Sequence, residues 1–182
     1  GMDKKGEIDY LSKIIGPDVG LITNINYAHA KNFKNIKQIA LAKSEIINNI
    51  NPNGFIVLNA DDNFYALHQK IAKEKKLKVI SFGIRSRKAN IKLINIKSFR
   101  KNFRIQISLN NKNKYFLISN DFQNYIYNTL SALAVISIYK NIFKLPENIF
   151  LNFKIPEGRG DHSIIKINKK KINLIDQSYN SN

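Results

Sequence analysis

Short apolar runs alternate with amphipathic segments in the first half of the chain, and this alternation restricts the fold more than any other feature. The runs VGLITNI (19–25) and LKVISFG (77–83) predict buried strands, and FIVLNADD (55–62) predicts a buried strand that runs into an acidic loop. The segments 35–50 and 63–76 between them repeat apolar residues at helical spacing. Strands that alternate with helices form βαβ units with a parallel sheet. We therefore predict an α/β fold with a mainly parallel, Rossmann-like sheet flanked by helices.

The pattern changes after residue 83. Residues 90–119 alternate apolar and polar side chains between turns rich in Asn and Lys, which predicts a small antiparallel section of hairpins. A long helix is expected over 121–142 and a short one over 146–153. The stretch IPEGRGDH (155–162) reads as a Gly/Pro hinge before two further strands. We expect one unit over 1–155 and the beginning of a second over 156–182.

Composition narrows the class of protein. The chain has 182 residues, of which 43% are hydrophobic, as in globular domains. The longest apolar run, at 130–139, is too short to span a bilayer, so no membrane insertion is expected. There are no cysteines, which excludes disulfides and thiol catalysis and suits a cytoplasmic protein.

The chain is strongly basic, with a formal net charge of +17. One interpretation is a nucleic-acid-binding domain, because basic surfaces attract polyanions. The other is a compositional bias toward Lys, Asn and Ile, since the lysines are spread over the whole length instead of being clustered with Arg and aromatic residues. We favour the second and expect no nucleic-acid partner.

One lysine interrupts the apolar stripe of the segment NIKQIALAKSEIINNI (35–50). Lys43 lies four positions after Ile39 and three before Ile46, so it falls within the stripe. Lysine is rarely buried without a partner. Either its stem covers apolar surface while its amine reaches solvent, or burial there keeps the amine neutral and reactive.

Polar residues also follow two of the predicted strands. His29 lies in the loop after the run 19–25, and Asn59 opens the sequence NADD (59–62). Ligands bind at the carboxyl ends of strands in open α/β sheets, so both residues are candidate contacts. The alternatives are a surface histidine at 29 and a helix N-cap at Asp62.

Several short stretches, in this order, resemble the Mur ligases of bacterial cell-wall synthesis, most closely the MurF type. Each alone is unspecific, but their order and spacing cover nearly the whole chain. They are GEI (6–8), PDVGLITNINYAH (17–29), AKSEI (42–46), VLNADD (57–62), NTLSALA (128–134), GRG (158–160) and LIDQSYNSN (174–182).

The resemblance implies two metal ligands, which are also the candidate catalytic residues. Lys43 corresponds to a lysine that carbon dioxide carbamylates in this family, and the carbamate helps to hold a second Mg²⁺. His29 corresponds to the family's magnesium-binding histidine. A carbamate is an anionic oxygen ligand of the kind that Mg²⁺ prefers.

The resemblance also implies contacts to ATP. Asn59 corresponds to a residue near the nucleotide, and Asn128 to an asparagine that contacts adenine at the start of a long helix. Arg159 corresponds to a hinge arginine that reaches the ATP phosphates, a task that suits a guanidinium group. Asp176 corresponds to an acid close to the nucleotide.

The chain departs from the family pattern at several points. The Gly and His that usually precede the adenine-contacting Asn are Phe122 and Asn124 here, and Gln177 replaces an acid. No G-x-x-x-x-G-K-[ST] phosphate loop occurs in the sequence. We therefore expect residues 1–155 to be a partial central ATP-binding domain that lacks its P-loop, and 156–182 the hinge and first strands of a truncated C-terminal domain.

The implied parent activity is ATP-dependent amide ligation in peptidoglycan precursor synthesis. In that reaction UDP-N-acetylmuramoyl-tripeptide (UDP-MurNAc-tripeptide) is activated as an acyl phosphate and joined to D-alanyl-D-alanine. We expect the chain alone to bind ATP and Mg²⁺ weakly and to be inactive. The alternatives are the basic nucleic-acid-binding domain and another ligase of the superfamily, such as a folylpolyglutamate synthase.

Overall fold

The computed structural model describes residues 2–27, 32–153, 158, 161–168, 170–176 and 178, and of these it gives residues 121, 123, 124, 161 and 162 without their side chains. The helices are α1 (Glu7–Ile15), α2 (Ile36–Asn48), α3 (Tyr65–Glu74) and α4 (Ile126–Tyr139), with 3-10 helices η2 (Asn120–Tyr125) and η3 (Ile142–Lys144). The strands are β1 (Val19–Ile22), β2 (Phe55–Asn59), β3 (Lys78–Gly83), β4 (Ile91–Phe99), β5 (Asn102–Leu109), β6 (Lys112–Ser119), β7 (Asp161–Ile167) and β8 (Lys170–Asp176).

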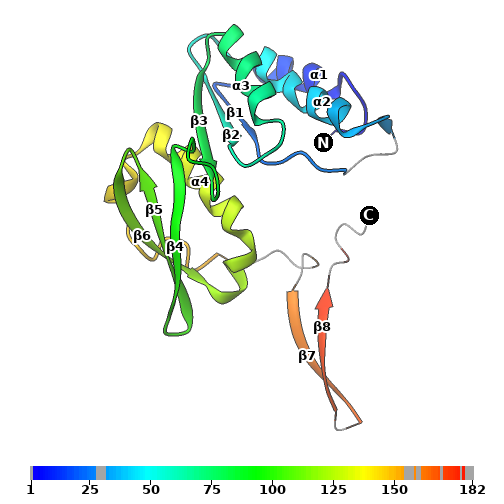
Figure 1. The fold of residues 1–182 in the computed structure, drawn as a ribbon. Coiled ribbons are helices and arrows are strands. Elements are labelled where there is room, and N and C mark those ends of the chain that lie inside the picture. Colours follow the sequence, from blue (N-terminus) through cyan, green and yellow to red (C-terminus); the bar gives the residue numbers. More distant parts are fainter. Residues whose placement is uncertain are drawn as a thin grey trace.

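Six strands form one sheet in the order β1-β2-β3-β4-β5-β6 (Figure 1). The pairs from β1 to β4 are parallel, with Leu21 beside Val57 and Val57 beside Ile80. The pairs β4–β5 and β5–β6 are antiparallel, as the alternation over 90–119 predicts. The predicted fold class is confirmed: a mainly parallel sheet with helices on its faces and a small antiparallel section.

The strands β2 and β3 are covered on both faces, and consecutive residues of β2 point to opposite sides. Val57 packs with Phe82 and with Leu130 of α4 in the larger apolar cluster. Ile56 and Leu58 belong to a second cluster with Ile47 of α2, Ala72 of α3 and other residues. Because β2 and β3 contribute side chains to both clusters, they read in the sequence as nearly continuous apolar runs.

Local signals set the helix ends. The side chain of Asn35 accepts a hydrogen bond from the backbone N–H of Gln38 at 3.0 Å and so caps the start of α2. Gly16 ends α1 with φ 56°, a left-handed conformation that glycine adopts without steric cost. The ends of α2 agree with the predicted segment 35–50 to within about two residues, the usual scatter of boundaries. The helix predicted over 121–142 begins later, at Ile126, because residues 120–125 form the 3-10 helix η2.

Two predictions were wrong. The run 19–25 was expected to be a buried strand; it does form β1, but this strand lies at the edge of the sheet and Leu21 is 36% exposed. Ile15 of α1 is also exposed, at 71%. The predicted helix over 146–153 is also not formed, and Phe150 makes a parallel bridge to Ile118 of β6 instead.

The last two strands form a separate antiparallel hairpin, in which Asp161 pairs with Asp176. Figure 1 shows this hairpin extending away from the six-stranded sheet. A unit boundary near residue 155 stays a prediction. No helix in the described part of the chain is long and apolar enough to cross a membrane.

Candidate functional site

Strands β1, β2 and β3 are parallel neighbours, so the segments that follow them meet at one edge of the sheet. These segments are residues 23–26 after β1, 60–64 after β2 and 84–86 after β3. The carboxyl edge of an open α/β sheet is where such folds bind ligands. Several side chains tie the three segments together here.

Asn59, at the end of β2, bridges two of the segments. Its Nδ2 donates a hydrogen bond to the carbonyl oxygen of Thr23 at 3.1 Å, and its Oδ1 accepts one from the backbone N–H of Asp61 at 2.9 Å. The amide therefore has both a donor and an acceptor role within the protein. The structure places Asn59 at the predicted edge and gives it a bridging function.

Asp62 adds a second link to the segment after β1. Its Oδ2 accepts from the backbone N–H of Ile25 at 2.8 Å, while its Oδ1 accepts from the N–H of Phe64 at 2.8 Å. The predicted N-cap role is wrong: Phe64 is the N-cap of α3 and its side chain makes no capping hydrogen bond, so Asp62 acts in the preceding turn. Because α3 begins at Tyr65, the contact to Phe64 orders the turn before the helix.

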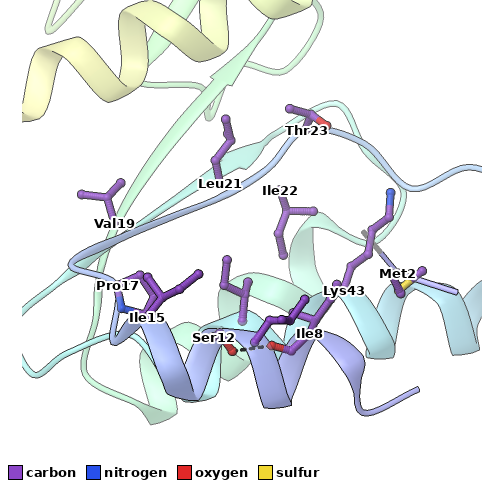
Figure 2. A pocket seen from close by; sticks show the side chains of 12 residues that line it. Met2, Ile8, Ser12, Ile15, Pro17, Val19, Leu21, Ile22, Thr23 and Lys43 are labelled. Atoms are coloured by element: carbon purple, nitrogen blue, oxygen red, sulfur yellow. Dashed lines mark hydrogen bonds between the residues drawn. The ribbon is translucent and has the colours of Figure 1, made fainter. Parts of the chain in front are cut away.

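Lys43 reaches the same segment from α2. Its side chain runs past Ile22 (Figure 2). Its Nζ donates a hydrogen bond to the carbonyl oxygen of Asn24 at 2.9 Å. The residue is half-buried. Burial lowers the pKa of the Lys43 amine below its ordinary value, and the negative charge of Asp62 opposes this only in part. A larger fraction of neutral, nucleophilic amine follows at a given pH.

Asp61 connects the segments after β2 and β3. Its carboxylate accepts hydrogen bonds from the backbone N–H groups of Ile84, Arg85 and Ser86. It also accepts one from the hydroxyl group of Tyr127 in the first turn of α4. The residue that follows Tyr127 is Asn128, which is exposed at this end of α4. Sequence reasoning missed Asp61, although its place in NADD after a strand was a usable signal.

Not all the predicted site residues join this edge. Asp176 ends β8 on the separate hairpin, where its Oδ1 accepts from the backbone N–H of Ser178 at 2.9 Å. That bond lowers the pKa of the Asp176 carboxyl. His29 and Arg159 lie outside the described residues. The carboxyl edge thus brings together Lys43 and Asn59, and α4 presents Asn128 beside Tyr127.

A hollow of about 570 Å³ is lined by residues of α1, β1 and α2 (Figure 2). Lys43 is at one end of it, and Leu21 and Ile15 are among the side chains that line it. The lining is mostly apolar, with Ser12, Thr23 and Lys43 as its polar members. Lys43 is half-buried beside this mostly apolar lining, and burial is the main cause of the lowered pKa of its amine.

The described residues as they stand do not suit Mg²⁺. They contain no group of three or more His, Asp or Glu side chains placed to hold a metal ion. The ammonium form of Lys43 repels a cation, and its Nζ donates to Asn24 instead of offering a lone pair. Carbamylation would replace that cation by an anionic oxygen ligand, so the residues fit magnesium only in the modified form.

Residues 1–136 match the family of the Mur ligase middle domain, which is about three quarters of the chain. The chain belongs to the Mur ligase family. The UDP-N-acetylmuramoyl-tripeptide–D-alanyl-D-alanine ligase of Rickettsia prowazekii is 31% identical to it over 173 residues, 94% of this chain. The aligned part is 38% of that relative, so the chain spans well under half the length of the ligases that it matches.

Solved MurF structures share this fold over almost the whole chain. MurF from Acinetobacter baumannii has a TM-score of 0.80 and 24% identity, with 99% of this chain and 38% of that protein covered. The MurF ligase of Thermotoga maritima in complex with ADP has a TM-score of 0.77 and 20% identity, with 97% and 39% covered. The family resemblance noted in the sequence is confirmed, and a nucleic-acid-binding domain is not favoured.

Proposed function

We propose that this Mur ligase chain forms part of the ATP-binding domain of a MurF-type enzyme. The reaction is the ATP-dependent joining of D-alanyl-D-alanine to UDP-MurNAc-tripeptide through an acyl phosphate. The names of its relatives and the ADP bound to the Thermotoga maritima ligase support this proposal. The observation that carries it is the half-buried amine of Lys43, held at the carboxyl edge of the sheet by Asn24.

Lys43 is the proposed precursor of a metal ligand. The neutral amine attacks the carbon of carbon dioxide, a nitrogen–carbon bond forms, and the nitrogen releases one proton to give an anionic carbamate. Burial that lowers the pKa of Lys43 favours the form that can react. With His29, the carbamate would hold Mg²⁺, which supplies positive charge to the phosphoryl group during transfer.

The nucleotide contacts are proposed for Asn59, Asn128, Arg159 and Asp176. Asn59 and Asn128 belong to elements that end or begin at the ligand-binding edge of the sheet. Asp176 lies on the hairpin, so its contact with the nucleotide requires the hairpin to approach that edge. The sequence contains no G-x-x-x-x-G-K-[ST] loop, and we therefore expect weak ADP binding and no ligation by these residues alone.

The test is a carbon-13 NMR experiment on the chain supplied with ¹³C-bicarbonate at mildly alkaline pH. A carbamate signal is expected in the wild type and in the control Lys70→Met, which removes a lysine whose side chain is 76% exposed. The signal should be absent in Lys43→Met. No carbamate signal in the wild type would refute the proposed role of Lys43.

Nucleotide binding is measured separately by titrating the chain with ADP and following its amide NMR signals. Shifts at the segments after β1 and β2 and at the start of α4 are expected. An ATPase assay is expected to show negligible turnover. Uniform, unspecific shifts over the whole basic surface would contradict a nucleotide site at the carboxyl edge.

A further inference from the structure

The carboxylate of Asp61, in the turn after β2, accepts hydrogen bonds from several groups at once. Its Oδ2 lies 2.6 Å from the backbone nitrogen of Ile84, and its Oδ1 lies 2.6 Å from that of Ser86. The N–H of Arg85 lies between them, 3.2 and 3.1 Å from the two oxygens. Three successive N–H groups thus converge on one carboxylate, as they do around a bound anion.

Glycine at position 83 makes this approach possible. A Cβ atom at Gly83 would lie 3.1 Å from Oδ1 and 3.2 Å from the Cγ of Asp61. Those distances are tighter than ordinary van der Waals contact. The end of β3 and the carboxylate are therefore fitted to each other, and the segment 84–86 is held in place by a residue from the turn after β2.

The same carboxylate reaches α4. The hydroxyl group of Tyr127 donates to Oδ2 of Asp61 at 3.0 Å. Leu130, Leu133 and Ala134 fix the depth of α4 on the sheet by apolar packing, which is not directional. A hydrogen bond between Tyr127 and Asp61 is directional, and it fixes the position of the first turn along and around the helix axis.

Electrostatics strengthen the arrangement. Burial raises the pKa of the Asp61 carboxyl, but the hydrogen bonds from residues 84–86 and Tyr127 outweigh it, and the pKa is lowered overall. The carboxylate is therefore ionised at neutral pH, and all four donors face a charged acceptor. Hydrogen bonds to charged groups are stronger than those between neutral groups.

From this geometry we infer that Asp61 is a positioning residue for the nucleotide: through Tyr127 it sets the place of the adjacent Asn128 relative to the carboxyl edge. The inference rests on the proposed function, because Asn128 is the residue proposed to contact the adenine base. Asp61 itself touches backbone and Tyr127, so its effect on the base is indirect. We expect Asp61 to affect the contact between the protein and the adenine base, and not the contacts with the phosphates.

The test uses Tyr127→Phe, which removes the hydroxyl and leaves the bonds from 84–86 intact, and Asp61→Asn, which weakens the whole cradle. The control is Tyr65→Phe, whose hydroxyl accepts from Gln69 on α3 at 3.0 Å. ADP and tripolyphosphate, which has no base, are titrated against each variant. Loss of one hydrogen bond predicts about a 5-fold weaker affinity for ADP in Tyr127→Phe and unchanged affinity for tripolyphosphate.

A second measurement needs no nucleotide. The amide NMR signals of Asn128 in the free chain should shift in Tyr127→Phe and Asp61→Asn and stay in place in Tyr65→Phe. Unchanged Asn128 signals would overturn the inference, and so would equal losses for ADP and tripolyphosphate. If the wild type binds neither ligand, the proposed function fails, and the Asn128 signals alone then decide whether Asp61 positions α4.

Discussion

Replacing Gly83 with alanine tests how tightly β3 and the Asp61 carboxylate fit together. The backbone at Gly83 lies outside the left-handed region, so alanine causes no backbone strain there. Its Cβ would stand 3.1 Å from Oδ1 of Asp61, and the carboxylate must move by a few tenths of an ångström. The bonds to Ile84 and Ser86, both 2.6 Å, are the ones that this movement disturbs.

The expected cost follows from two opposing effects. Alanine is about 0.5–1 kcal/mol more favourable than glycine within a strand. A hydrogen bond to a charged group contributes about 1.5–3 kcal/mol, and we expect the equivalent of one such bond to be lost. Gly83→Ala should therefore lower the free energy of unfolding by about 1–2 kcal/mol.

The assay is urea unfolding followed by circular dichroism, with the slope m checked for constancy. The same substitution is then made in an Asp61→Ala background, where the carboxylate is gone. There its cost should fall below about 0.5 kcal/mol, because the two residues act through one contact. An equal cost of Gly83→Ala in both backgrounds would refute the proposed fit.

Four further substitutions test other parts of the structure. The pKa of Lys43 is lower in the folded chain than its unfolded value near 10.5, so the charged amine costs stability at neutral pH. Lys43→Met should therefore raise the urea midpoint at neutral pH, and this gain should shrink as pH approaches 10.5. The buried His68, whose Nε2 is 3.1 Å from the carbonyl oxygen of Ala40, has a lowered pKa, so the free energy of unfolding should fall as pH drops below about 6.5. The fall should be less steep in His68→Gln, and equal slopes would argue against burial of a neutral ring. Ile47→Ala should cost about 2–5 kcal/mol in the same assay, whereas Ile15→Lys at the exposed side of α1 should change stability by less than about 0.5 kcal/mol.

The position of His68 indicates that this histidine of α3 has a structural role in packing. The ring is buried against α2 and its lowered pKa is caused first by burial. Lys43 is different, because its amine lies at the carboxyl edge of the sheet, where we propose that the nucleotide binds. Burial lowers the pKa of both residues. Their positions relative to the sheet distinguish the structural role of His68 from the candidate functional role of Lys43.

Periodicity in the sequence determined the α/β class, the antiparallel section and most of the helices and strands. These features are local, since they depend on which residues a segment turns toward a core. The motif NADD also placed Asn59 at the end of a strand, and the motif AKSEI placed Lys43 on the helix that reaches the same edge of the sheet. The resemblance to the Mur ligases rested on such short motifs, and the match over residues 1–136 confirmed it.

Only the tertiary structure decided which strand lies at the edge and which side chains meet there. A short apolar run looks the same whether it is central or at an edge, so β1 was expected to be buried. Asp61 meets residues 84–86 and Tyr127 across 23 to 66 positions of sequence, and no local pattern encodes that meeting. Strand order brings these groups together, and strand order follows from the packing of the whole chain rather than from the periodicity of any one segment.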